Sequence, residues 1–275
     1  MLTSSPSGSS DPFEEAVDAV VNGDLSKLQS LLQTYPDLAQ ARSTRFTHRA
    51  TLLHYIAANG TEDHRQKSPP NAVAVATALL DAGAAPDALA TFYGGECTTL
   101  SLLISSHHPA QAGVQVPLID LVVARGASVY PVETALVFGY REAAEALIRH
   151  GAPVTLPTAA ALGQAAGVEA LLPTADPLSR HRALALAAQS GQLETTQMML
   201  DAGEDPNRFN PPGTHGHSTP LHQAALAGHL EVVRLLVERG ARLDICDTIH
   251  QGTPLGWAEY GKQPKIAEYL KSRNT

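Results

Sequence analysis

The chain has 275 residues, of which 44% are hydrophobic and only 5% aromatic, and its formal charge is −8 at pH 7. This negative balance argues against nucleic acid as a partner, because nucleic-acid binding draws heavily on Lys and Arg. No run approaches the ~18 consecutive apolar residues of a membrane span. Cys97 and Cys246 fit no disulfide framework, so we expect a cytoplasmic protein that contacts no membrane.

The first ten residues, MLTSSPSGSS, are small and polar, which predicts a disordered N-terminal tail. They hold no basic start, no apolar stretch and no cleavage site, so they do not predict a secretory signal. The following residues, 11–275, are expected to form one domain built from repeated helical units.

Similar units recur along this domain. One begins with LLH at residues 52–54 and ends with LLDAGA at residues 79–84. Another, at residues 183–203, reads ALALAAQSGQLETTQMMLDAG, and the last begins with TPL at residues 253–255. An alanine-rich stretch followed by an amphipathic one predicts a pair of short helices in each unit.

The best-formed unit occupies residues 218–241. Its first helix is expected to begin at Thr219 and Pro220, since a hydroxyl caps free N–H groups and proline fits the first turn. Its second helix is predicted over residues 230–238, with Leu235 fully buried on the apolar face.

This unit resembles the ankyrin repeat, whose signature is Thr-Pro-Leu-His-x-Ala followed by a second helix and a Gly-Ala ending. The resemblance implies an all-α solenoid of helix-turn-helix units, of the bacterial, stand-alone type, in which each unit buries its apolar face against its neighbours. The matching positions are Thr219, Pro220, Leu221, His222, Ala224, Ala225, Gly228, Val232, Val233, Leu235, Leu236, Gly240 and Ala241.

The number of units follows from the glycines that close them, Gly83, Gly126, Gly151, Gly203 and Gly240. If the longest interval holds two compact units, the spacing averages about 31 residues, near the ankyrin period of ~33. We therefore predict about eight units, with the second and third enlarged and the fourth and fifth shortened.

In ankyrin-repeat proteins the first helices line a concave face, and the loops between units project as fingers where partners dock. The resemblance implies fingers at residues 41–49, 91–98, 207–218 and 246–252. Aromatic, Arg and His side chains are typical contact residues, since they bury much area for each ordered side chain. With two aromatic residues from the final unit, the candidate partner-binding residues are Arg45, Phe46, His48, Phe92, Tyr93, Glu96, Arg208, Phe209, His215, His217, His250, Trp257 and Tyr260.

Packing is the alternative for part of this set. Phe92, Phe209 and Ile249 are also compatible with fingers that pack against one another. Trp257 and Tyr260 lie three residues apart on a predicted helix, a spacing typical of helix packing as well as of a ligand site.

Two insertions, at residues 62–71 and 107–114, are predicted between the two helices of their own units. They are expected to form a second recognition patch, with Arg65, Lys67 and His107, or to be tolerated growth of surface loops.

A zinc site at His215, His217 and His250 is the metal hypothesis that the sequence allows. Zinc needs three or four converging ligands, and no Cys or carboxylate spacing here indicates such a site, so we expect no metal and no cofactor. His222 matches the signature histidine of the ankyrin repeat, which implies a structural role for it and for His54.

Catalytic signals are weak. The Gly94-Gly95-Glu96 turn is neither a phosphate-binding loop nor a dinucleotide fingerprint. We therefore predict a monomeric, non-catalytic module that binds another protein through the concave face and the fingers. The alternative is a small-molecule-binding or enzymatic solenoid with a pocket between the fingers.

Overall fold

The computed structural model describes residues 11–44, 46–58, 61–129 and 132–273. It divides into two compact units. Unit 1 comprises residues 1–131 and 142–152, and unit 2 comprises residues 132–141 and 153–275. The expected N-terminal tail, residues 1–10, lies outside the described residues.

Unit 1 holds three complete helix pairs: α1 (Pro12–Asn22) with α2 (Leu25–Thr34), η2 (Leu52–Ala57) with α3 (Ala72–Asp81), and α4 (Thr99–Leu103) with α6 (Gln115–Ala124). Its remaining elements are η1 (Pro36–Ala39), η3 (Asp63–Arg65), β1 (Ala90–Phe92), β2 (Gly95–Cys97), α5 (His107–Gln111) and, from Glu142 onward, α8 (Arg141–Arg149).

Unit 2 begins with α7 (Val132–Val137), which precedes α8 in the chain. Four further pairs follow, α9 (Leu156–Leu162) with α10 (Ala165–Leu171), α11 (Pro177–Gln189) with α12 (Leu193–Asp201), α13 (Pro220–Ala227) with α14 (Leu230–Glu238), and α15 (Pro254–Tyr260) with α16 (Pro264–Arg273); η4 (Leu172–Thr174) follows α10. The described residues thus hold the eight predicted pairs, with short helices in the fourth and fifth.

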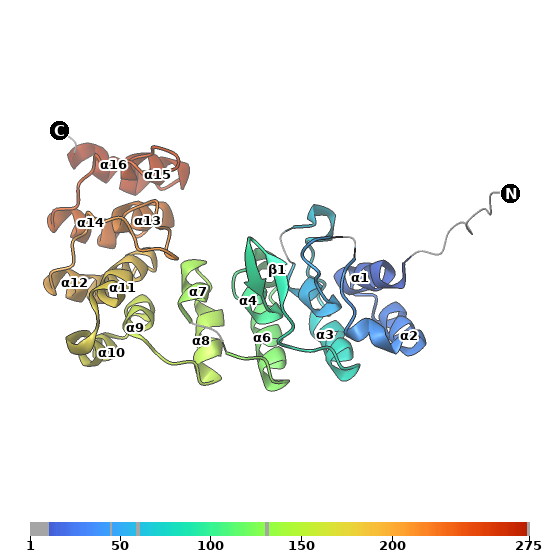
Figure 1. Cartoon of the computed structure of the whole chain (residues 1–275). Helices are drawn as coiled ribbons and strands as arrows, with labels where there is room; N and C mark the ends of the chain where they lie inside the picture. The colour runs from blue at the N-terminus through green and yellow to red at the C-terminus, as the bar shows by residue number, and fades with distance from the viewer. Residues whose placement is uncertain (1–10, 45, 59–60, 130–131, 274–275) are drawn as a thin grey trace. The chain divides into compact units, whose positions relative to one another are not determined.

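Each helix pair stacks on the next within its unit. In unit 2 the first helices α9, α11, α13 and α15 contact one another in order, as do the second helices α10, α12, α14 and α16. Figure 1 shows these two rows side by side, yellow to red. The core is therefore a ribbon of Ala, Leu and Val between the rows, as expected of a repeat stack.

The capping residues explain where the first helices begin. In α13 the hydroxyl and the backbone N–H of Thr219 both donate to Nδ1 of His222, at 2.8 and 3.3 Å. Because a backbone N–H can only donate, Nδ1 is the acceptor, and Nε2–H donates to the Gly252 carbonyl at 3.1 Å. The predicted structural role of His222 is confirmed.

His54 repeats this arrangement in unit 1. Its Nδ1 accepts from Thr51, and Nε2–H donates to the Cys97 carbonyl at 3.3 Å. Each of these histidines therefore ties its own first helix to the loop before the next one.

The expected burial of Leu235 is wrong. Leu236 is 0% exposed, whereas Leu235 is half-buried. The buried stripe of α14 is formed by Val232, Val233 and Leu236, and position 235 flanks it. A second helix packs along one stripe only, so a residue about 100° from its centre stays partly exposed.

The two insertions lie between the helices of their own pairs, as predicted, but Arg65 is not a surface residue. It is 4% exposed and pairs with Glu14 and Asp18 of α1, at 2.8 and 2.9 Å, and with Glu62 at 3.0 Å. Residues 61–71 are therefore fixed to α1 through a buried guanidinium. Lys67 and His107 are exposed, and the patch at these two residues stays a prediction.

Candidate functional site

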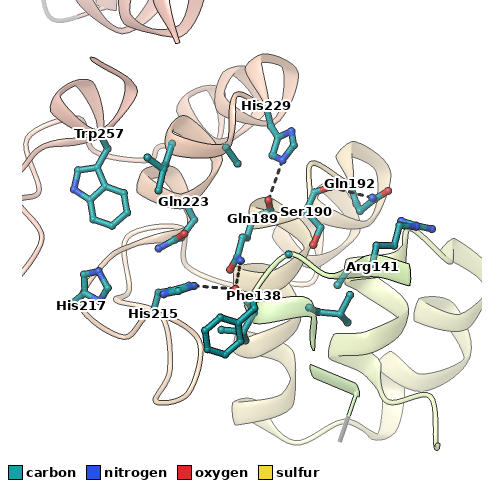
Figure 2. Close-up of a pocket in the computed structure, with 16 residues that line it drawn as sticks. Phe138, Arg141, Gln189, Ser190, Gln192, His215, His217, Gln223, His229 and Trp257 are labelled. Carbon is teal, nitrogen blue, oxygen red and sulfur yellow. Dashed lines mark hydrogen bonds between the residues drawn. The ribbon is translucent and has the colours of Figure 1, made fainter. Parts of the chain in front are cut away.

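A hollow of about 700 Å³ lies in unit 2 on the side of the first helices (Figure 2). Its wall is built from the ends of the first helices, the turns that follow them and the tip of the finger at residues 207–218. The lining residues are Leu136, Val137, Phe138, Gly139, Arg141, Ala161, Gln189, Ser190, Gln192, His215, His217, Gln223, Leu226, Ala227, His229 and Trp257.

A second hollow of about 460 Å³ adjoins it and shares His217, Leu226 and Trp257 with it. The second hollow adds His250 and Tyr260, together with two glycines. We call the two hollows together the unit 2 groove.

One repeated position supplies the row of side chains along this groove. It is the residue just before the glycine of the turn between the two helices of a pair. The residues at this position that line the groove are Phe138, Ser190, Ala227 and Tyr260, before Gly139, Gly191, Gly228 and Gly261. Stacking of the pairs brings these four positions onto one face.

The finger at residues 207–218 is held against the first helices by its carbonyls and by His215. His181 of α11 donates to the Phe209 carbonyl at 2.8 Å. His215 donates to the Val137 carbonyl at 3.1 Å, which also accepts from Gln189 at 2.7 Å (Figure 2). His215 has φ 58°, a left-handed conformation that costs free energy for a residue other than glycine, so these bonds hold a defined loop.

Trp257 is fixed by a buried carboxylate. Its Nε1–H donates to Oδ2 of Asp247 at 2.9 Å, and the same carboxylate accepts backbone N–H bonds from Ile249, His250 and Gly252. Burial alone disfavours the ionised form, but the four donors outweigh it and hold the pKa of Asp247 below its ordinary value. The indole therefore has a fixed orientation in the groove wall.

His217 lies against this indole, with ring centroids 5.6 Å apart. Desolvation is the main reason that the pKa of His217 is lowered, and the neighbouring His215 and His250 lower it further, against the opposing effect of Asp247. His217 is consequently neutral at pH 7, and the charges of His215, Asp247 and His250 affect how readily it takes up a proton.

The structure brings three of the candidates from the unit 1 fingers together as a packed stack. His48 lies between Phe46 and Phe92, with ring centroids 5.2 and 5.0 Å away. His48 and Phe92 are 5% and 2% exposed, so neither offers surface to a partner, and for Phe92 this fits the packing alternative. Arg45 lies outside the described residues.

Tyr93 and Glu96 are exposed beside this stack, and the ring centroid of Tyr93 is 6.5 Å from that of Phe92. Tyr93 is 75% exposed, at the tip of the β1–β2 hairpin. Tyr93 and Gly94 have φ 52° and 80°, as the two-residue turn of a tight hairpin requires. The turn thus holds an aromatic ring outward at a cost in backbone strain.

In unit 2, His215, His217, His250, Trp257 and Tyr260 all line the groove. The other two candidates in this unit, Arg208 and Phe209, are exposed but line neither hollow, and Ile249 is 62% exposed. Exposure of Phe209 and Ile249 does not fit the packing alternative that was open for them.

Several groove residues were not predicted. Arg141, Gln189 and Gln223 lie on α8, α11 and α13, and Phe138 and Ser190 lie in the turns after α7 and α11, so none of the five belongs to a finger. Phe138 and Ser190 could have been predicted, because each precedes the turn glycine of its helix pair, a position that can be identified when the sequences of the repeats are aligned. Arg141 and the glutamines carry no comparable mark in a single sequence.

Within the described ranges, no group of three or more His, Cys, Asp and Glu side chains is placed to hold a metal ion. The described helices are also too short or too polar for any of them to cross a membrane.

Comparison with models of known families matches the last third of the chain. Residues 184–275 match a family model described as ankyrin repeats, three copies. Rat cyclin-dependent kinase 4 inhibitor B is 35% identical over 116 residues, which cover 32% of this chain and 88% of the inhibitor.

Two larger proteins match over short segments. The mouse ankyrin repeat and SAM domain-containing protein 6 is 37% identical over 98 residues, 36% of this chain and 11% of that protein. Human histone-lysine N-methyltransferase EHMT1 is 41% identical over 63 residues, 23% of this chain and 5% of that protein. These relatives are mammalian, so they lend no support to the expected bacterial type.

Proposed function

The chain belongs to the ankyrin-repeat family, and on that premise we propose that it is a non-catalytic module that binds another protein. The contact surface is the concave face of unit 2, where the unit 2 groove lies, with the exposed finger residues of that unit, and the exposed finger residues of unit 1 form a separate part of the proposal. The observation that carries the proposal is the groove itself, a continuous hollow lined by aromatic, His and Gln side chains, among which His215, His217 and Trp257 are half-buried. Such side chains are the usual anchors of protein interfaces.

The relatives support a protein as the partner. The rat relative is by name an inhibitor of a cyclin-dependent kinase, and a kinase is itself a protein. Exposed large side chains support the same reading: Tyr93 is 75% exposed, Tyr260 is 86% exposed, and neither is required by the interhelical core.

A small-molecule ligand is the second candidate. The volume of about 700 Å³ favours it, since ligand pockets commonly span 300–1,000 Å³. The two candidates differ in the role of Tyr260, because a residue this exposed contributes to a broad protein contact and little to the binding of an enclosed ligand.

The compartment and the oligomeric state form part of the proposal. The proposed protein is a monomer in the cytoplasm, and the reducing compartment is supported by Cys97 and Cys246, which form no disulfide with each other.

The experiment is quantitative affinity capture from the source cell with the full chain and four single variants, Tyr93→Ala, Phe209→Ala, His250→Ala and Tyr260→Ala. Leu193→Ala is the matched control, since Leu193 is 45% exposed in unit 2 and lines neither hollow. We expect a captured protein whose affinity falls by more than about 1 kcal/mol in some variants and not in the control. Equal capture by all variants would contradict the proposed surface, and unchanged melting temperatures would show that the fold is intact.

A further inference from the structure

The chemistry of the unit 2 groove differs from that of the chain as a whole. Asp and Glu account for 27 of the 275 residues, yet no carboxylate is among the groove-lining residues in the described part of the chain. Four of the twelve histidines line it, His215, His217, His229 and His250, and Arg141 stands at the opposite end (Figure 2).

Asp247 is the carboxylate whose charge acts on His217 and on the neighbouring His222. Asp247 is 0% exposed, and its two oxygens accept four N–H bonds from its own loop and from Trp257. These bonds hold the ionised carboxylate behind the wall of the groove, as buried carboxylates require, and its negative charge favours the protonated form of His217.

An apolar contact lies beside the imidazoles. The indole of Trp257, half-buried and fixed by Asp247, forms part of both hollows, and Tyr260 continues the same wall. A large apolar side chain placed against Trp257 lies next to His217, whose ring centroid is 5.6 Å from that of the indole.

We infer that the partner enters this groove with an extended acidic segment, which sets an apolar side chain against Trp257 and carboxylates toward His217 and His250. This inference rests on the proposed function and adds the chemistry of the partner. The charge complementarity is between this segment and a wall that carries imidazoles and one guanidinium but no carboxylate.

Such binding is coupled to proton uptake. His217 faces His215 on its own finger, Asp247 and His250 on the next finger, and the rings of Trp257 and, beyond it, His222. A carboxylate of the partner favours the charged imidazole of His217, so the complex holds a proton more tightly than the free protein does. Affinity consequently rises as the pH falls below neutral.

The test uses a library of random twelve-residue peptides displayed on phage, selected at pH 6 on the full chain. The same library is selected in parallel on Tyr260→Ala and on the control Leu193→Ala. The expected result is enrichment of peptides that combine Asp or Glu with Trp, Phe or Leu on the full chain and on the control, and loss of these peptides on Tyr260→Ala.

Enrichment of neutral or basic peptides, equal enrichment on Tyr260→Ala, or no enrichment at all would overturn the inference. The proposed function is judged separately by the affinity capture, which reports a protein partner of any composition. If affinity capture recovers a partner through the groove but the phage selection enriches basic peptides, the proposed function is supported and the inference of an acidic segment is wrong.

The peptides enriched most strongly then provide a pH readout. Fluorescence polarisation should show binding that is about three- to tenfold tighter at pH 5.5 than at pH 7.5, the effect of a pKa change of about half a unit to one unit. His217→Gln should reduce this pH dependence clearly, because only His250 then remains to meet a carboxylate of the peptide, while Leu193→Ala keeps it. A pH-independent affinity in the unaltered chain would contradict the proton coupling.

Discussion

Units 1 and 2 solve the same packing problem with different side chains. Unit 2 stacks regular pairs through Ala, Leu and Val, and its surplus His and aromatic residues line an open groove. Unit 1 has enlarged pairs, and buried polar groups hold its finger and its first insertion: Glu62 accepts from His48, Tyr55 and Arg65. In one unit the departures from the repeat stabilise the fold, and in the other they are available for contact.

The largest expected effect is in unit 1. Arg65→Met removes the cation shared by Glu14, Asp18 and Glu62 and leaves the Glu62 carboxylate buried, which should cost about 3–5 kcal/mol of unfolding free energy. Hydrogen exchange of α1 should accelerate accordingly. Lys67→Met, in the same insertion but exposed, is the control, and equal effects of the two changes would remove the distinction between the units.

The corrected register of α14 gives the next effect. Leu236→Ala should cost about 2–5 kcal/mol, through lost transfer energy and a cavity in the unit 2 core. Leu235→Ala should cost clearly less, because Leu235 is only half-buried. Denaturant unfolding of both variants measures the difference, and a larger loss at Leu235 would restore the register expected from the sequence.

A pH effect of similar or smaller size is expected from His54. Burial lowers the pKa of His54 to about 4, although its bond to the Cys97 carbonyl opposes this. The unfolded chain therefore takes up the proton more readily. Stability should be constant above about pH 7 and fall by about 3 kcal/mol between pH 6.5 and pH 4.

Proton NMR can follow this titration directly, with His54→Gln to assign the signal. We expect the His54 resonance to keep its neutral position down to about pH 5. A midpoint near 6.5 would mean that the ring is not buried as described.

The smallest expected change in stability is that of Tyr260→Ala in unit 2, and Phe92→Ala in unit 1 provides the contrast. Tyr260→Ala should leave the melting temperature of the chain within the range of surface substitutions, ±0.5 kcal/mol, because Tyr260 is 86% exposed. Phe92→Ala should destabilise unit 1 by about 3 kcal/mol or more, since Phe92 is 2% exposed and stacked on His48. Thermal melts of the two variants make the comparison.

The sequence predicted the repeat class and the number of pairs because capping residues and closing glycines are local signals. Thr219, Pro220 and Gly228 bound α13 as expected. The sequence did not predict the buried ion pairs of Arg65. An arginine that is surrounded by polar residues in the sequence is expected to be exposed, and its partners on α1 are known only from the structure.

The candidate site was predicted only in part for the same reason. A finger marks His215 and His217 by its composition, whereas the burial of Phe92 depends on a hairpin that meets another finger. Contacts between two loops do not recur at a fixed spacing in the sequence, unlike the contacts between the helices of a repeat. The sequence alone therefore does not show which side chains of a finger are buried and which are exposed.

The acceptors of His54 and His222 are backbone carbonyls, of Cys97 and Gly252. Every residue type supplies a backbone carbonyl, so this hydrogen bond between successive helix pairs does not restrict the side chain of the residue that accepts it. Fingers can change in composition and length over evolutionary time, from a strand hairpin at residues 90–97 to a coil at residues 246–252, without loosening the stack. A family built on such joints can acquire new binding surfaces one loop at a time.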